Sequence, residues 1–153
     1  MIWSSFEAAA PELAQFGRKR FGTGVAFLAT TKADGAPRVH PVTPIIGGGR
    51  LFLFMEPTSP KGEDLRRDGR FALHSSVEDS GGGGGEFLIE GKAKSVEDPN
   101  ARQLAAESAS YEPSDRYVLF ELQILRALST VYDERGRARR IRWCCESKGF
   151  RAS

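Results

Sequence analysis

The chain has 153 residues, which is enough for one domain with a hydrophobic core and too short for two of ordinary size. Its 22 lysines and arginines are nearly balanced by 20 acids, so bulk charge gives no indication of nucleic-acid binding. The N-terminal residues lack the basic and apolar segments of a signal peptide, and no apolar run approaches the roughly 18 residues of a membrane helix. We therefore expect a cytoplasmic protein.

The first part of the chain predicts a helical segment followed by strands. Residues 4–20 carry a loose apolar stripe, which Pro11 is expected to interrupt. Apolar runs separated by turn signals such as "ADG" then predict strands, and the first three should form an antiparallel meander. Seven strands are expected, over residues 24–31, 38–46, 51–55, 70–77, 86–96, 117–133 and 139–146.

Two further helices have clear start signals. Ser59 and Asp98 each precede a proline, the arrangement of an N-cap followed by the first helical residue. These signals predict helices over residues 59–67 and 98–109. Five consecutive glycines at 81–85 favour a disordered loop between strands.

Prolines interrupt the second predicted strand. Because proline has no amide hydrogen, Pro41 and Pro44 require this strand to lie at an edge, to bulge or to open. An opened strand would offer backbone groups to a ligand. Alternatively, the prolines only protect an edge from aggregation, and the sequence does not decide between the two.

Lys61 occupies an unusual place in the stretch "SPKGEDL". It lies in the first helical turn, where free amides and the positive end of the helix dipole favour an anion over a cation. An anionic ligand would resolve the repulsion, and the hydroxyls of Ser59 and Thr58 could donate to it. Ser59 could instead only cap the helix, and Lys61 could be an ordinary solvated lysine.

Arg38 and His40 share one face of the second strand, since side chains two residues apart point the same way. The guanidinium of Arg38 suits a phosphate group, although a surface charge beside a turn is an equally simple interpretation. His40 and His74 are the only histidines, and the adjacent Cys144 and Cys145 point to opposite faces, so we expect no metal site.

Trp143 lies in the basic strand "RRIRW". Alternation places Arg140, Arg142 and Cys144 on one face, with Ile141 and Trp143 on the other. The indole could meet a negatively charged planar ligand or a partner subunit, and a plain packing role is an open alternative.

Four pieces in order carry a family resemblance: the "LAT…DG.P" hairpin, "RVHPVTP", "SPKGEDLRRDGR" and "RFAL". Over residues 22–145 the chain resembles the pyridoxamine 5′-phosphate oxidase-related, FMN-binding split-barrel family. The resemblance implies a mainly β fold, an antiparallel split β-barrel of six to seven strands with flanking helices. It also implies one domain over 1–153, with an N-terminal helical segment at 1–21 and a tail at 146–153.

The resemblance further implies a homodimer with the cofactor in a groove at the subunit interface. The phosphate would meet the first helical turn and the start of the second strand, and the ring would lie along that strand. A partner subunit would contribute from the fifth and last strands. The implied cofactor-binding residues are Arg38, Val39, His40, Pro41, Val42, Met55, Thr58, Ser59, Lys61, Glu86 and Trp143.

The implied function is an FMN-dependent oxidoreductase that passes hydride or electrons between the flavin and a small substrate. A reductase using the deazaflavin coenzyme F-420, a non-catalytic flavin or tetrapyrrole module, and a dimer without cofactor are the alternatives. The tail lacks the arginine–histidine motif of pyridoxamine 5′-phosphate oxidase itself, so vitamin B6 oxidation is not expected. No acid or base is identified beyond His40 and His74.

Overall fold

The structure, a computed structural model, describes residues 1–145, and the predicted tail at 146–153 lies outside these residues. The helices are α1 (Trp3–Ala9), α2 (Pro11–Phe21), α3 (Pro60–Arg67) and α4 (Pro99–Ser108). The strands are β1 (Ala26–Thr31), β2 (Pro37–Val42), β3 (Ile45–Gly47), β4 (Arg50–Met55), β5 (Arg70–Ser75), β6 (Glu86–Val96), β7 (Val118–Tyr132) and β8 (Ala138–Cys144).

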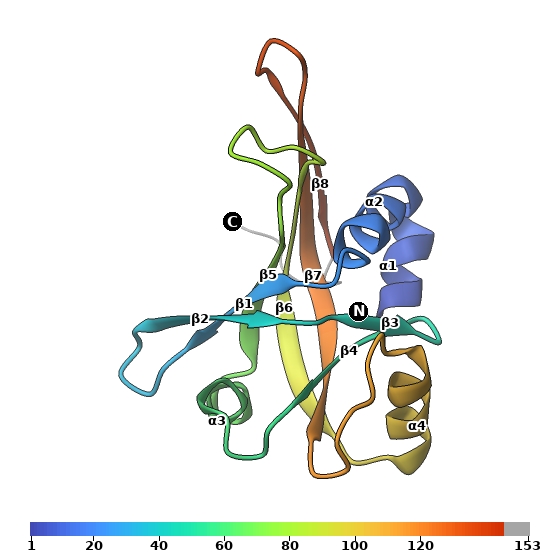
Figure 1. Cartoon of the computed structure of the whole chain (residues 1–153), viewed down its shortest axis with the longest axis vertical. Coiled ribbons are helices and arrows are strands. Elements are labelled where there is room, and N and C mark those ends of the chain that lie inside the picture. The colour runs from blue at the N-terminus through green and yellow to red at the C-terminus, as the bar shows by residue number, and fades with distance from the viewer. Residues whose placement is uncertain (146–153) are drawn as a thin grey trace, which may run out of the picture.

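All the strand pairs are antiparallel and belong to one eight-stranded sheet in the described part of the chain. Its order is β2-β1-β5-β6-β7-β4-β3, with β8 paired to the free part of β7 (Figure 1). The prediction of a mainly β fold with flanking helices is confirmed. The described sheet has eight strands rather than the expected six to seven. No helix in residues 1–145 is long and apolar enough to span a membrane.

Pro44 accounts for the extra strand. The single strand predicted over 38–46 is divided into β2 and β3, which lie at opposite ends of the strand order. Both antiparallel pairings of the predicted meander are present, β2 with β1 and β3 with β4, but the middle strand is not continuous. β4 also pairs with β7, which places the two pairs at opposite ends of the sheet. In the same way, Pro11 divides the predicted N-terminal helix into α1 and α2.

The main core lies on one face of the sheet. Five strands contribute buried side chains, and aromatic residues of α1 and α2 pack against them. Figure 1 shows these two helices next to each other on one side of the sheet. Trp3, Phe6 and Phe21 lie within contact distance of one another or of Phe87. A second, smaller cluster lies between α4 and the opposite side of β4. Within residues 1–145, the helices thus leave the other face of β1, β5 and β6 uncovered in a single copy.

The glycine loop has a defined course in the structure, contrary to the expectation of disorder. The Asp79 carboxylate accepts hydrogen bonds from the Gly81 and Gly83 amides, at 2.8 and 3.1 Å. Gly82, Gly84 and Gly85 have positive φ, which explains why the turn requires glycine here.

A β-bulge displaces β7 against β6. The register shifts between Glu90 and Gly91, so that Leu125 has no partner on β6. Gly91 makes this close approach possible, because a Cβ at that position would overlap the carbonyl oxygen of Gln123. The extra residue changes the phase of β7: Ile124 and Ala127 both face the core, and Arg126 faces outward.

Substituting Gly91→Ala should therefore destabilise the fold. The clash is with backbone on the partner strand, and relieving it should cost about 1–3 kcal/mol of unfolding free energy. Urea unfolding followed by circular dichroism measures this, with Gly81→Ala in the exposed loop as the control. Equal stability of the two variants would contradict the close-approach explanation.

Candidate functional site

The N-terminus of α3 is built by local signals that the sequence displays. Ser59 caps the helix, and its Oγ accepts a hydrogen bond from the Gly62 amide at 3.2 Å. A Cβ on Gly62 would lie 3.1 Å from the sulfur of Met55, so glycine lets the first turn pack closely against the end of β4. The capping role of Ser59 is confirmed, and its hydroxyl hydrogen is not needed for that role.

Lys61 faces a cavity of 270 Å³ between this turn and the end of β2. The ammonium is half-buried, and burial lowers the pKa of Lys61 from its usual value, an effect that Glu56 partly offsets. Glu56 is engaged in an ion pair with Arg116, and no carboxylate in residues 1–145 forms a salt bridge with Lys61. The cavity is lined by Pro41, Val42, Thr43, Phe54, Met55, Glu56, Lys61, Tyr111 and Tyr117.

Arg38 is held by Asp64, one turn along α3 from Lys61. Its Nε donates to Asp64 Oδ2 at 2.7 Å, and the same oxygen accepts from Thr30 Oγ1 at 2.8 Å. Arg67 donates to the other oxygen at 3.0 Å. The terminal nitrogens of Arg38 make no hydrogen bond within the described residues, so they can contact a ligand while Asp64 fixes the side chain.

Asp64 is only 2% exposed, and its ionisation supports the fold. Burial alone would raise the pKa of Asp64, but hydrogen bonds from Arg38, Thr30 and Arg67 outweigh it and hold the pKa below its usual value of 3.8. A depressed pKa in the folded state stabilises the fold above the unfolded-state pKa, and this contribution disappears as the pH falls.

The stability advantage of the wild type over Asp64→Asn should consequently be constant near neutral pH and shrink as the pH falls below about 4. Urea unfolding across a pH series measures it. Asp115→Asn, at an exposed carboxylate, controls for the removal of a charge alone. An advantage that does not change down to pH 3 would contradict an ionised, arginine-bound Asp64.

The residues predicted on the second strand separate onto two faces. Alternation places Val39 and Pro41 on the face opposite that of Val42. Pro41 and Val42 both line the Lys61 cavity, while Val39 is 64% exposed. His40 is exposed, with its Nδ1 2.8 Å from the Pro41 carbonyl oxygen. β2 is an edge strand that ends just before Pro44, which agrees with both interpretations of the prolines.

Three predicted residues lie away from this cavity. Thr58 is exposed in the connection before α3. Glu86 lies at the start of β6, where its carboxylate accepts a hydrogen bond from Tyr132 at 3.3 Å. Trp143 packs its ring 5.0 Å from that of Phe6, which supports the packing role that the sequence left open. In one copy of the chain, neither Glu86 nor Trp143 lines the cavity.

The sequence prediction missed five residues of the cavity lining, Thr43, Phe54, Glu56, Tyr111 and Tyr117. Burial and the neighbouring Tyr117 raise the pKa of Tyr111. Its phenol, protonated at neutral pH like that of an ordinary tyrosine, can donate to an acceptor. Both tyrosines belong to the connection between α4 and β7. Two aromatic residues in the polar stretch "SASYEPSDRY" were the available signal.

The face of the sheet opposite the core, here called the outer face, presents two rows of side chains across six strands. Residues directly opposite in antiparallel register share a face. The first row is Pro41, Phe27, His74, Leu88, Leu128 and Arg142. The second row is Val39, Ala29, Ala72, Glu90, Arg126 and Cys144. Phe27 is 43% exposed, so the outer face includes large apolar side chains in contact with solvent.

Solved structures with similar folds come from several bacteria. A conserved hypothetical protein, Rv2991, from Mycobacterium tuberculosis aligns with a TM-score of 0.64 and 22% identity, over 78% of this chain and 82% of that protein. A heme binding protein from Mycobacterium smegmatis aligns with a TM-score of 0.60 and 22% identity, over 77% of this chain and 52% of its own length.

PhzG from Burkholderia lata 383, solved in complex with tetrahydrophenazine-1-carboxylic acid, aligns with a TM-score of 0.66 and 16% identity. The alignment covers 95% of this chain and 89% of PhzG. At these identities the likeness shows the fold. No curated protein matches the sequence.

The sequence itself matches one family model, described as pyridoxamine 5′-phosphate oxidase, over residues 11–131. This segment contains every strand from β1 to β6, both α3 and α4, and nearly all of β7. The open antiparallel sheet and its flanking helices agree with the solved structures. The chain belongs to the pyridoxamine 5′-phosphate oxidase family and has its split-barrel fold.

Proposed function

We propose that this protein is an oxidoreductase that binds FMN and passes hydride or electrons between the flavin and a small substrate. The bound flavin supplies the redox chemistry, and the protein binds and orients it. The observation that carries the proposal is Lys61, a half-buried ammonium in the first turn of a capped helix with no carboxylate partner in residues 1–145.

A phosphate group fits this environment. Backbone amides at the start of α3 and the helix dipole attract an anion, and Lys61 adds a full positive charge. Arg38 supplies further donors from β2, held in place by Asp64. The Ser59 hydroxyl can donate to the phosphate while its oxygen caps the helix. Each group stabilises a dianion more than a neutral ligand.

The remainder of the cofactor needs more room than one chain provides. The Lys61 cavity has 270 Å³, just below the about 300–1,000 Å³ of sites that enclose a whole drug-sized ligand. A homodimer that covers the outer face would complete the groove, with Glu86 as a contribution from a second copy, whereas Trp143 packs against Phe6 on the core side. The exposed Phe27 and Val39 support this part of the proposal, because association would remove them from water.

The deazaflavin coenzyme F-420 is the second candidate cofactor, since it also presents a phosphate and a planar tricycle to Lys61 and Arg38. Haem is a third, because one similar structure is a heme binding protein. Within the described lining of the Lys61 cavity, Met55, Tyr111 and Tyr117 are of types that ligate haem iron, and neither histidine lines it. The cationic lining favours the phosphate-bearing cofactors.

The absorption spectrum of the purified full chain tests the assignment, followed by titration with FMN, F-420 and haem. The proposal predicts bands near roughly 370 and 450 nm, in the protein as purified or after FMN is added. If only F-420 binds, the cofactor is the deazaflavin and not FMN. Binding of haem alone, or of none of the three, would overturn the proposed function.

A further inference from the structure

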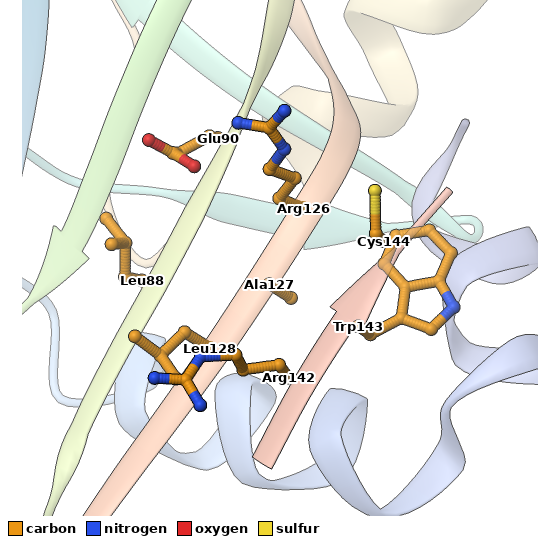
Figure 2. A pocket seen from close by; sticks show the side chains of 8 residues that line it. All are labelled: Leu88, Glu90, Arg126, Ala127, Leu128, Arg142, Trp143 and Cys144. Atoms are coloured by element: carbon orange, nitrogen blue, oxygen red, sulfur yellow. The ribbon is translucent and has the colours of Figure 1, made fainter. Parts of the chain in front are cut away.

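A second pocket, of 380 Å³, lies on the outer face over β6, β7 and β8 (Figure 2). It shares no lining residue with the Lys61 cavity. Its lining consists of Leu88, Glu90, Arg126, Ala127, Leu128, Arg142, Trp143 and Cys144. The pocket therefore has an apolar floor and two arginines, a combination that neither the core nor the proposed cofactor site explains.

The two arginines stand diagonally across the floor. Arg126 lies opposite Glu90 and Cys144 in the register, while Arg142 lies opposite Leu128. Figure 2 shows the Arg126 guanidinium near Glu90 and the Arg142 guanidinium beside Leu128. The bulge at Leu125 brings Arg126 onto this face, because it reverses the alternation of β7.

Neither guanidinium has a charged partner within the part of the chain that the structure describes. In residues 1–145, neither Arg126 nor Arg142 forms a salt bridge, although nine other basic side chains do. Among residues 1–145, Glu90 is the only carboxylate that lines the pocket, and it faces Arg126 without forming an ion pair with it. The Arg142 end therefore carries the stronger uncompensated positive charge.

We propose that this pocket binds a small organic acid with a flat, apolar body. The carboxylate would accept two parallel hydrogen bonds from Arg142, the geometry that a guanidinium offers to a planar anion. The body would cover Leu88 and Leu128, which face outward and are partly exposed to water. Arg126, next to Glu90, would attract the acid to the pocket and lie along its body.

The outer face is also the face that we propose a second copy covers. Guanidinium groups enclosed there without an anion would be costly, because a buried charge that lacks a partner strongly destabilises an interface. An organic acid would supply the missing charge. The identification of this acid as the substrate rests on the proposed function, whereas its binding to the pocket does not.

Isothermal titration of the full chain with 2-naphthoate tests the proposal. We expect binding by the wild type, at least tenfold weaker binding by Arg142→Gln, and a smaller loss for Arg126→Gln. The matched control is Arg140→Gln, an exposed arginine on the same strand face that does not line the pocket. Its affinity should stay within about twofold of the wild type, as for a surface charge away from the ligand.

Neutral 2-naphthalenemethanol separates acid recognition from apolar adsorption, since it should bind more weakly and respond little to Arg142→Gln. The proposal is overturned if the neutral compound binds as tightly as the acid, if Arg140→Gln loses as much affinity, or if naphthoate does not bind at millimolar concentration. It is also overturned if Arg142→Gln changes only the association of two copies.

The same variants, titrated with FMN, keep the two proposals apart. Arg142→Gln should lose naphthoate affinity and retain the wild-type FMN affinity. Arg142→Lys should bind naphthoate with intermediate affinity, because lysine keeps the positive charge but lacks the two parallel N–H donors of the guanidinium. Naphthoate binding without FMN binding would support the pocket while rejecting the flavin. A naphthoate affinity that survives Arg142→Gln would reject the pocket whatever the flavin does.

Discussion

Replacing Lys61 with methionine should weaken FMN binding about 10- to 100-fold, the loss expected for a charge-assisted hydrogen bond of about 1.5–3 kcal/mol. The half-buried ammonium has no carboxylate partner in the described chain, so its charge is available to the phosphate. Riboflavin, which lacks the phosphate, should bind Lys61→Met and the wild type about equally. Fluorescence titration of both flavins measures the difference.

The control is Lys19→Met, at an exposed lysine on α2. It removes the same charge from the protein without touching the α3 turn, so FMN affinity should be unchanged. If Lys61→Met and Lys19→Met bind FMN equally well, Lys61 is an ordinary solvated lysine and the phosphate lies elsewhere.

Phe27→Glu should separate the proposed dimer into monomers and remove the flavin with it. Phe27 lies within the first row of the outer face, where a second copy would bury it. A buried carboxylate without a partner costs about 3–5 kcal/mol, which corresponds to at least about a hundredfold increase in the dimer dissociation constant. Sedimentation velocity measures the association, and FMN titration measures the cofactor site.

Val131→Glu is the matched control, because Val131 is 44% exposed and faces α2 rather than the outer face. It should remain dimeric and bind FMN as the wild type does. A monomeric wild type, or a Phe27→Glu variant that stays dimeric, would contradict an interface on the outer face. A monomer that retains full FMN affinity would show that one chain completes the cofactor site.

Features that depend on neighbouring residues could be predicted from the sequence. Ser59 and Asp98 cap their helices as expected, since each cap needs only its own side chain and an amide two or three residues on. β6 begins and ends at the predicted residues, 86 and 96, because its apolar pattern lies between turn signals. The anion-binding character of the α3 turn follows from the same local reasoning.

Features that depend on distant parts of the chain could not be predicted. Pro44 visibly interrupts a strand, but the placement of β2 and β3 at opposite ends of the sheet follows from their pairing with β1 and β4. The bulge at Leu125 depends on Gly91 in another strand.

The candidate site shows the same division. From the sequence, Asp64 is expected to be an exposed acid on the surface of a helix. In the structure it is buried against Arg38, which lies 26 residues earlier. Tyr111 and Tyr117 reach the cavity from a connection whose course depends on the packing of α4. The sequence allows Trp143 either to contact a ligand or to pack in the core. The position of Phe6, which the sequence does not show, favours packing.

Equilibrium binding of FMN and riboflavin to the wild-type full chain tests the central claim most directly, because the two ligands differ only in the phosphate. If α3, Lys61 and Arg38 hold that group, FMN should bind at least about 100-fold more tightly, the equivalent of one or two charge-assisted hydrogen bonds. Equal affinities for the two flavins would contradict a phosphate site at the N-terminus of α3.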